Sequence, residues 1–134
     1  MQSPTAAPLT VLVAEDNEIN RFFIVRLLRQ QGHQVMEALD GQQALCLLGQ
    51  HGFDLALLDI QMPHADGIEV LQRIRRLDDE QHRHTPVIAL TAYAMLGDRE
   101  KFLQSGFDSY LAKPIQPGDL EAAIDAVLQP IYTP

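Results

Sequence analysis

The chain has 134 residues, which is the length of one ordinary domain. Hydrophobic residues make up 46% of the sequence and charged residues 21%, so an intrinsically disordered chain is excluded. The formal net charge of −8 disfavours direct binding to nucleic acid or to an acidic membrane surface. The single cysteine, Cys46, excludes an internal disulfide framework and a cysteine-rich metal site, and we expect a cytoplasmic location.

The first eight residues, MQSPTAAP, are mostly small, contain proline and show no apolar periodicity. Residues 1–8 are therefore expected to form a tail or a linker. We expect residues 9–129 to form one domain and residues 130–134 to form a C-terminal tail. The linker-like start favours a domain taken from a larger protein, with a stand-alone domain as the alternative.

A short apolar run at residues 10–14 predicts a first strand that is buried on both faces. Asn17 can cap the helix that follows, and Gly32 can end it. Apolar side chains recur in this helix at helical spacing: Ile19, Phe22, Phe23 and Leu27. Residues 34–38 predict a weaker second strand.

Asp40 can cap a second helix, in which we expect Cys46 to be a packing residue. Residues 55–60 and 86–91 predict a third and a fourth strand, both strongly apolar, with an amphipathic helix between them. We expect His82 and His84, in the polar loop after that helix, and His64, in an earlier loop, to face solvent.

A fourth helix carries an apolar stripe and ends at Gly106; the stripe consists of Met95, Leu96, Phe102 and Leu103. Residues 109–112 predict a fifth strand, and a last amphipathic helix follows. Five alternating strands and helices predict an α/β fold with a parallel sheet and helices on both faces. With right-handed crossovers, we expect the doubly wound, flavodoxin-like strand order 2-1-3-4-5.

Polar residues stand where four of these strands end. Glu15 and Asp16 follow the first strand, Asp59 closes the third, Thr91 closes the fourth, and Lys113 follows the fifth. Because the carboxyl ends of parallel strands share one edge of the sheet, we expect these side chains to form one cluster.

The three carboxylates repel one another, and a hard cation such as Mg²⁺ would offset their charge with oxygen ligands. A lysine and a hydroxyl donor beside a carboxylate suit phosphoryl transfer, with the carboxylate as nucleophile. Asp59 is the preferred nucleophile because a buried strand precedes it and a turn follows it. Glu15 and Asp16 are more typical of metal ligands.

Four motifs in this order resemble the receiver domains of two-component response regulators, over residues 9–128. They are VAEDN at 13–17, DIQMP at 59–63 with a glycine at 67, ALTA at 89–92 and LAKP at 111–114. The resemblance implies that Asp59 is the phosphoacceptor and that Mg²⁺ or Mn²⁺ is the cofactor. It implies Asp16 as a direct metal ligand, Glu15 as a ligand acting through water, and the backbone carbonyl of Gln61 as a third protein ligand.

The resemblance also implies that Thr91 contacts a phosphoryl oxygen and that Lys113 pairs with the phosphate. It further implies a cis peptide bond between Lys113 and Pro114, and a conformational switch formed by Thr91 and Tyr110. The implied phosphodonor is a histidine kinase or a histidine phosphotransfer domain. We expect a monomer or weak dimer that does not bind nucleic acid directly and makes no membrane contact.

Two segments, EDNEIN at 15–20 and LTAYAMLGDRE at 90–100, are similar to receivers attached to hybrid histidine kinases. In that case the parent protein would be a histidine kinase, and this domain could be the cytoplasmic part of a membrane-bound one. The family often has other residues where Gln61 and Tyr93 stand, which leaves the phosphate lifetime open.

Other interpretations of the same residues remain. Each site residue taken alone is typical of a helix cap or a solvated surface charge. A turnover phosphatase would require a second carboxylate soon after the nucleophile, where Gln61 stands. A flavin-binding domain would require a phosphate-binding loop after the first strand, where Glu15 and Asp16 are electrostatically unfavourable. We therefore expect a signalling phosphoacceptor and not a classical enzyme.

Overall fold

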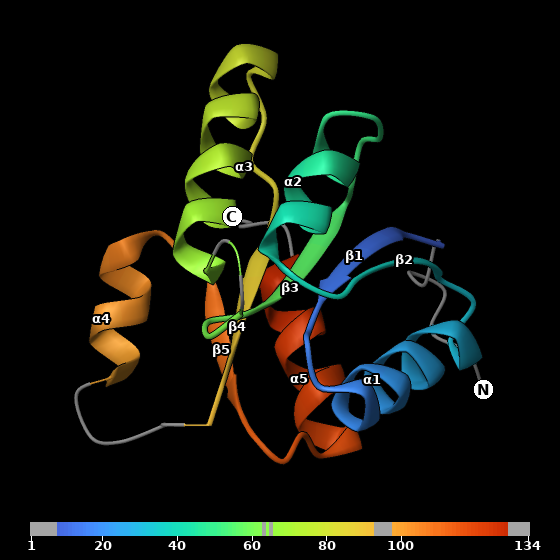
Figure 1. Cartoon of the computed structure of the whole chain (residues 1–134). Helices are drawn as coiled ribbons and strands as arrows, with labels where there is room; N and C mark the ends of the chain where they lie inside the picture. Colours follow the sequence, from blue (N-terminus) through green and yellow to red (C-terminus); the bar gives the residue numbers. More distant parts are fainter. Residues whose placement is uncertain (1–7, 63, 65, 93–97, 129–134) are drawn as a thin grey trace, which may run out of the picture.

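The structure is a computed structural model that describes residues 8–62, 64, 66–92 and 98–128. Within these residues, strands and helices alternate: β1 (Thr10–Ala14), α1 (Glu18–Gln30), β2 (Gln34–Ala38), α2 (Gly41–Leu48), β3 (Leu55–Asp59), α3 (Gly67–Gln81), β4 (Val87–Thr91), α4 (Asp98–Ser105), β5 (Ser109–Ala112) and α5 (Pro117–Leu128). The strands form one parallel sheet in the order β2-β1-β3-β4-β5. Helices α1 and α5 lie on one side of the sheet, and α2 and α3 on the other (Figure 1). The predicted α/β fold and strand order are confirmed.

Two apolar layers hold this arrangement together, because successive side chains of a strand point to opposite faces. In β1, Leu12 and Ala14 join the layer under α2 and α3, whereas Val11 and Val13 join the layer under α1 and α5. Strands β3 and β4 divide in the same way and are buried along their whole length. The continuous apolar runs in the sequence follow from this burial on both faces.

Helix α1 begins after Asn17, whose side chain accepts a hydrogen bond from the Asn20 amide at 2.9 Å, as predicted. Its buried residues are Ile24, Val25 and Leu28. The apolar residues that the sequence showed at helical spacing are largely outside this face: Ile19 is 78% exposed, Phe22 65% and Phe23 36%. The second and third turns of α1, not the first, make the contact with the sheet.

One other expectation about a single residue is wrong. Cys46 is exposed on α2 and is not a packing residue. His84 is exposed to solvent as expected, and its Nε2 also lies 2.7 Å from the Asp108 carboxylate. Residues 1–7 of the tail predicted at 1–8, the tail predicted at 130–134, and Tyr93, Met95 and Leu96 lie outside the described residues.

Arg75 of α3 lies at the edge of the sheet where β4 and β5 begin, and its guanidinium contacts four groups. It donates to the carbonyl oxygens of Thr85 and Gly106 at 2.7 Å each, and to the carboxylates of Asp78 and Asp108 at 2.9 Å each. These bonds link α3 to the segments that lead into β4 and β5. The residue after the end of α4, Gly106, is therefore fixed to the body of the domain.

At the other edge of the sheet, where the strands end, α3 begins at Gly67, which lies directly against the last residue of β3. A Cβ atom on Gly67 would lie 2.5 Å from the carbonyl oxygen of Asp59, closer than van der Waals contact allows. The Gly67 amide also donates to the Ile60 carbonyl at 3.2 Å. A residue without a side chain is therefore required for the loop after Asp59 to fold back as it does.

We predict that Gly67→Ala lowers the free energy of unfolding by about 1–3 kcal/mol, because backbone atoms must move to admit the methyl group. Urea denaturation would measure this change. Gly118→Ala is the matched control, since a Cβ there meets no atom within 4 Å. Equal stability of the two variants would contradict the close approach at Gly67.

Candidate functional site

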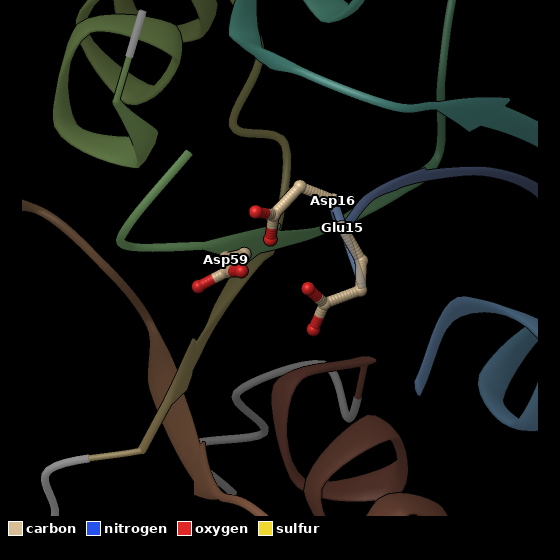
Figure 2. Close-up of side chains that lie close together, drawn as sticks. All are labelled: Glu15, Asp16 and Asp59. Atoms are coloured by element: carbon tan, nitrogen blue, oxygen red, sulfur yellow. The ribbon is translucent and has the colours of Figure 1, made fainter. Parts of the chain in front are cut away.

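Four strand ends bring the predicted site residues together. Glu15 and Asp16 directly follow β1, and Asp59 is the last residue of the neighbouring strand β3. Figure 2 shows the three carboxyl groups gathered where these strands end, and each offers an oxygen within 4.8 Å of the others. Asp59, Thr91 and Lys113 line a common cavity of about 440 Å³ at this edge.

The Lys113 ammonium joins two of the carboxylates. Its Nζ lies 2.7 Å from Oε1 of Glu15 and 3.0 Å from Oδ2 of Asp59. The backbone of Lys113 is fixed as well, because its amide donates to the Thr91 carbonyl at 2.8 Å. The peptide bond between Lys113 and Pro114 is cis. One positive charge is thus shared between the carboxyl ends of β1 and β3.

Glu15 is fully buried, and this burial sets its protonation. Burial raises the pKa of its carboxyl from 4.5 to about 7, and the hydrogen bond to Asp59 acts in the same direction. The contacts with Lys113 and with the Asn17 amide, which lies 3.1 Å from Oε2, oppose this shift without cancelling it. Glu15 therefore takes up a proton more readily than an ordinary glutamate.

Asp59 shows the opposite balance. Burial acts to raise its pKa, but hydrogen bonds with Glu15, Lys113 and Asp16 outweigh it, and the pKa lies below its ordinary value. The backbone amide of Gln61 adds a bond to Oδ1 at 3.1 Å. Burial acts to lower the pKa of Lys113, but its contacts with Glu15 and Asp59 outweigh this effect and raise the pKa. Asp59 thus stays ionised beside a lysine that stays protonated.

The donor set fits a hard divalent cation. Three carboxyl groups face one ammonium, so negative charge exceeds positive charge within the cluster. Oε1 of Glu15 makes the close ion pair with Lys113 but has no well-aligned hydrogen bond among the described residues. Asp16 is exposed and, with Gln61, lines the cavity, so oxygen ligands are accessible from solvent.

The two residues of the implied switch lie on neighbouring strands. Thr91 is buried at the end of β4 and lines the cavity. Tyr110 of β5 is half-buried, pairs in register with Ala89, and packs against Phe102 of α4 with ring centroids 6.1 Å apart. Phe102 also lines the cavity with Thr91, so both residues lie on the side of the site that faces α4.

Several residues of the site were not found from the sequence. Asn20, Ile60 and Phe102 also line the cavity, and Arg21 donates to the Glu15 carbonyl oxygen at 2.9 Å. Asn20 and Arg21 lie on the first turns of α1, where only a capping signal was visible. Phe102 belonged to an apolar stripe, and such a stripe does not distinguish a core residue from a residue that lines a cavity.

The family model of the response regulator receiver domain matches residues 11–125 of the chain. The chain therefore belongs to the response regulator receiver domains, the receiver modules of two-component systems. Among the residues that the structure describes, no helix is both long and apolar enough to cross a membrane.

Two curated relatives differ in how much of the protein such a domain makes up. The chain is 45% identical over 115 residues to hybrid signal transduction histidine kinase I of Dictyostelium discoideum, covering 82% of the chain and 7% of that protein. It is 42% identical over 108 residues to the polar-differentiation response regulator DivK of Brucella anthropi, covering 81% and 86%. The chain thus spans a small part of one relative and most of the other.

Solved receiver domains have the same fold. The receiver domain of sensor histidine kinase PA1611 from Pseudomonas aeruginosa, with magnesium coordinated in its active-site cleft, is 36% identical with a TM-score of 0.78, and the match covers 90% of this chain and 98% of that one. The receiver domain of Saccharomyces cerevisiae Ssk1, in complex with the histidine phosphotransfer protein Ypd1, gives 30% identity, a TM-score of 0.78 and coverage of 90% and 88%.

We predict that Lys113→Met lowers the free energy of unfolding by about 3 kcal/mol without added divalent cation, since it leaves buried carboxylates without their partner. The double variant Lys113→Met, Glu15→Gln should recover part of this loss because it removes one of those carboxyl groups. Urea denaturation at neutral pH would measure all three proteins. A Lys113→Met protein as stable as the wild type would show that the ion pairs contribute little.

Proposed function

We propose that this receiver domain accepts a phosphoryl group on Asp59 from a phosphohistidine and thereby acts as a relay or conformational switch. The observation that carries the proposal is the ionised, buried Asp59 carboxylate 3.0 Å from the Lys113 ammonium, in a cavity open to solvent. In the transfer, the N–P bond of the phosphohistidine breaks and an O–P bond to Asp59 forms. The histidine nitrogen keeps the electron pair of the broken bond.

The charges of the site support this transfer. Lys113 would compensate the charge of the incoming phosphoryl oxygens, and the Thr91 hydroxyl would donate a hydrogen bond to one of them. A Mg²⁺ or Mn²⁺ ion would be held by Asp16, Asp59, the carbonyl of Gln61 and, through water, Glu15. When bound, the cation neutralises negative charge on the phosphoryl group. The protein's own contribution is to hold Asp59 ionised and in place.

Turnover of external phosphate esters is not part of this proposal. Phosphate ester hydrolysis with an aspartate nucleophile needs a second acid or base beside it, and Gln61, two residues after Asp59, cannot supply one. Glu15 is fully buried and already paired with Lys113. The domain is therefore proposed as a phosphoacceptor that assists its own phosphorylation and dephosphorylation.

The first turns of α1 offer a surface for the phosphodonor. Ile19 and Phe22 are exposed there, while Asn17 and Asn20 of the same turns line the cavity. A protein that brings a phosphohistidine to Asp59 must cover the mouth of this cavity and so meets the apolar side chains beside it. The complex of the similar Ssk1 receiver with Ypd1 supports a histidine phosphotransfer domain or a histidine kinase as this partner.

We predict that incubation with Mg²⁺ and a small phosphodonor adds about 80 Da, the mass of one phosphoryl group, to the intact protein. Asp59→Asn should abolish the gain, because an amide is a poor nucleophile. Intact-protein mass spectrometry would measure both. No gain in the wild type, or an equal gain in Asp59→Asn, would overturn the proposal.

We predict that Asp16→Asn weakens Mg²⁺ binding by about tenfold or more, because it removes an anionic oxygen ligand. Isothermal titration calorimetry would give the affinities. Asp79→Asn, which changes an exposed aspartate of α3 away from the cavity, should bind Mg²⁺ like the wild type. Unchanged affinity in Asp16→Asn would remove this residue from the metal site.

We predict that Phe22→Ala slows phosphotransfer from a phosphorylated histidine phosphotransfer domain by about tenfold, the effect of losing an aromatic contact of about 1.4 kcal/mol. Phosphorylation by a small phosphodonor should stay unchanged, because the cavity is intact. Leu103→Ala, at an exposed apolar residue of α4, is the control. A Phe22→Ala protein that accepts phosphate at the wild-type rate from both donors would exclude α1 as the docking surface.

A further inference from the structure

Asp16, the proposed metal ligand, is exposed, so its place in the cluster depends largely on the backbone that carries it. Its side chain lies beside that of Asp59, just after the end of β1 (Figure 2). The pairings of β1 with β2 and β3 end at Ala14. The backbone at Asp16 therefore lies beyond the strand pairings, and other groups must hold it.

Three successive peptide groups around Asp16 are each held by a hydrogen bond. The Glu15 amide donates to the Ala38 carbonyl oxygen of β2 at 3.1 Å. The Asn17 amide donates to Oε2 of Glu15, also at 3.1 Å. Between these two, the peptide group that joins Glu15 to Asp16 accepts a hydrogen bond from Nη1 of Arg21 at 2.9 Å through its carbonyl oxygen. Because a peptide group is planar, this bond fixes the orientation of the unit that leads into Asp16.

Arg21 is itself held in place on both sides. Its side chain is only 11% exposed, and its amide donates to the Asn17 carbonyl oxygen at 2.9 Å in the first turn of α1. The Nε atom of the same guanidinium pairs with Oε1 of Glu37 on β2 at 3.3 Å, and Arg29 contacts this carboxylate as well, at 3.6 Å. The guanidinium thus bridges the end of β1 and β2 with two N–H donors in one fixed plane, which a lysine cannot supply.

Building on the proposed function, we infer that Arg21 is a positioning residue for Mg²⁺ binding, which acts by holding the peptide group between Glu15 and Asp16. A guanidinium has no acceptor atom, so Arg21 is not a ligand of the cation. Its effect passes through the backbone of Asp16. Groups that orient a metal ligand in this way typically change the metal affinity by about 10- to 100-fold when they are removed.

The direction of the change separates positioning from charge. The positive charge of Arg21 repels a cation bound nearby, so removal of this charge alone would strengthen Mg²⁺ binding. Loss of the hydrogen bond to the Glu15 carbonyl oxygen would instead weaken Mg²⁺ binding, because Asp16 would no longer be held in place. Weaker binding in a variant that lacks the charge is therefore a sign of positioning.

The test measures Mg²⁺ affinity by isothermal titration calorimetry and stability by urea denaturation without metal. We expect Arg21→Gln to weaken Mg²⁺ binding by about tenfold. Arg26→Gln removes the same charge from an exposed position of α1 and should bind Mg²⁺ at least as tightly as the wild type. Arg29→Gln loses a contact with Glu37 but no bond to Glu15, so any loss should be confined to the free energy of unfolding.

A double-mutant cycle tests whether Arg21 acts through Asp16. In Asp16→Asn the ligand is already impaired, so adding Arg21→Gln should leave Mg²⁺ binding about as weak as in Asp16→Asn alone. Two independent tenfold losses would instead multiply to about a hundredfold. The affinities of these weakly binding variants would be read from the amide chemical shifts of Ile60 and Gln61 during a Mg²⁺ titration.

Mg²⁺ affinity in Arg21→Gln equal to or higher than that of the wild type would overturn the inference, and so would a full hundredfold loss in the double variant. If Arg21→Gln does not fold, Arg21→Lys decides the question. It keeps the charge without the planar pair of donors, so Mg²⁺ binding should still weaken, and wild-type affinity there would overturn the inference. The proposed function fails separately, if the wild type binds Mg²⁺ but gains no phosphoryl group at Asp59.

Discussion

The ammonium of Lys113, shared between Glu15 and Asp59, is the interaction on which this site depends. Two carboxyl groups are buried side by side at the ends of adjacent strands, and such a pair would repel without a positive charge between them. The lysine follows β5, which is separated from β3 by β4, and a backbone hydrogen bond to Thr91 holds it near the site. The fold thus brings three strands to one point, and the charge balance there lowers the pKa of Asp59 while burial raises the pKa of Glu15 to about 7.

The backbone supports this charge cluster as much as the side chains do. The loop after Asp59 folds back over the end of β3, which Gly67 permits because it lacks a side chain. The Gln61 amide then binds the Asp59 carboxylate. At the other edge of the sheet, Arg75 closes a separate network around Asp78 and Asp108. One edge is therefore fixed by satisfied ion pairs, and the other keeps a cavity and an excess of negative charge.

Much of the fold was predictable from the sequence, because β1, β3 and β4 are buried on both faces and so appear as continuous apolar runs. The site followed from the fold, since parallel strands end at one edge and the residues there are polar. Helix faces were less predictable. Phe22 and Leu28 are equally apolar in the sequence, and only the packed structure shows that the first lies outside the contact with the sheet. Phe102 was visible as apolar, but its place in the cavity wall depends on how α4 is anchored at Gly106.

We propose that this cluster directs phosphorylation to Asp59 and to no other group. The most direct measurement is to reduce the acyl phosphate with borohydride after phosphorylation and to locate the modified residue by peptide mass spectrometry. We predict modification at Asp59 alone, and only when Mg²⁺ or Mn²⁺ is present. Modification at Glu15, at Asp16 or at a histidine, or at Asp59 equally without a divalent cation, would contradict it.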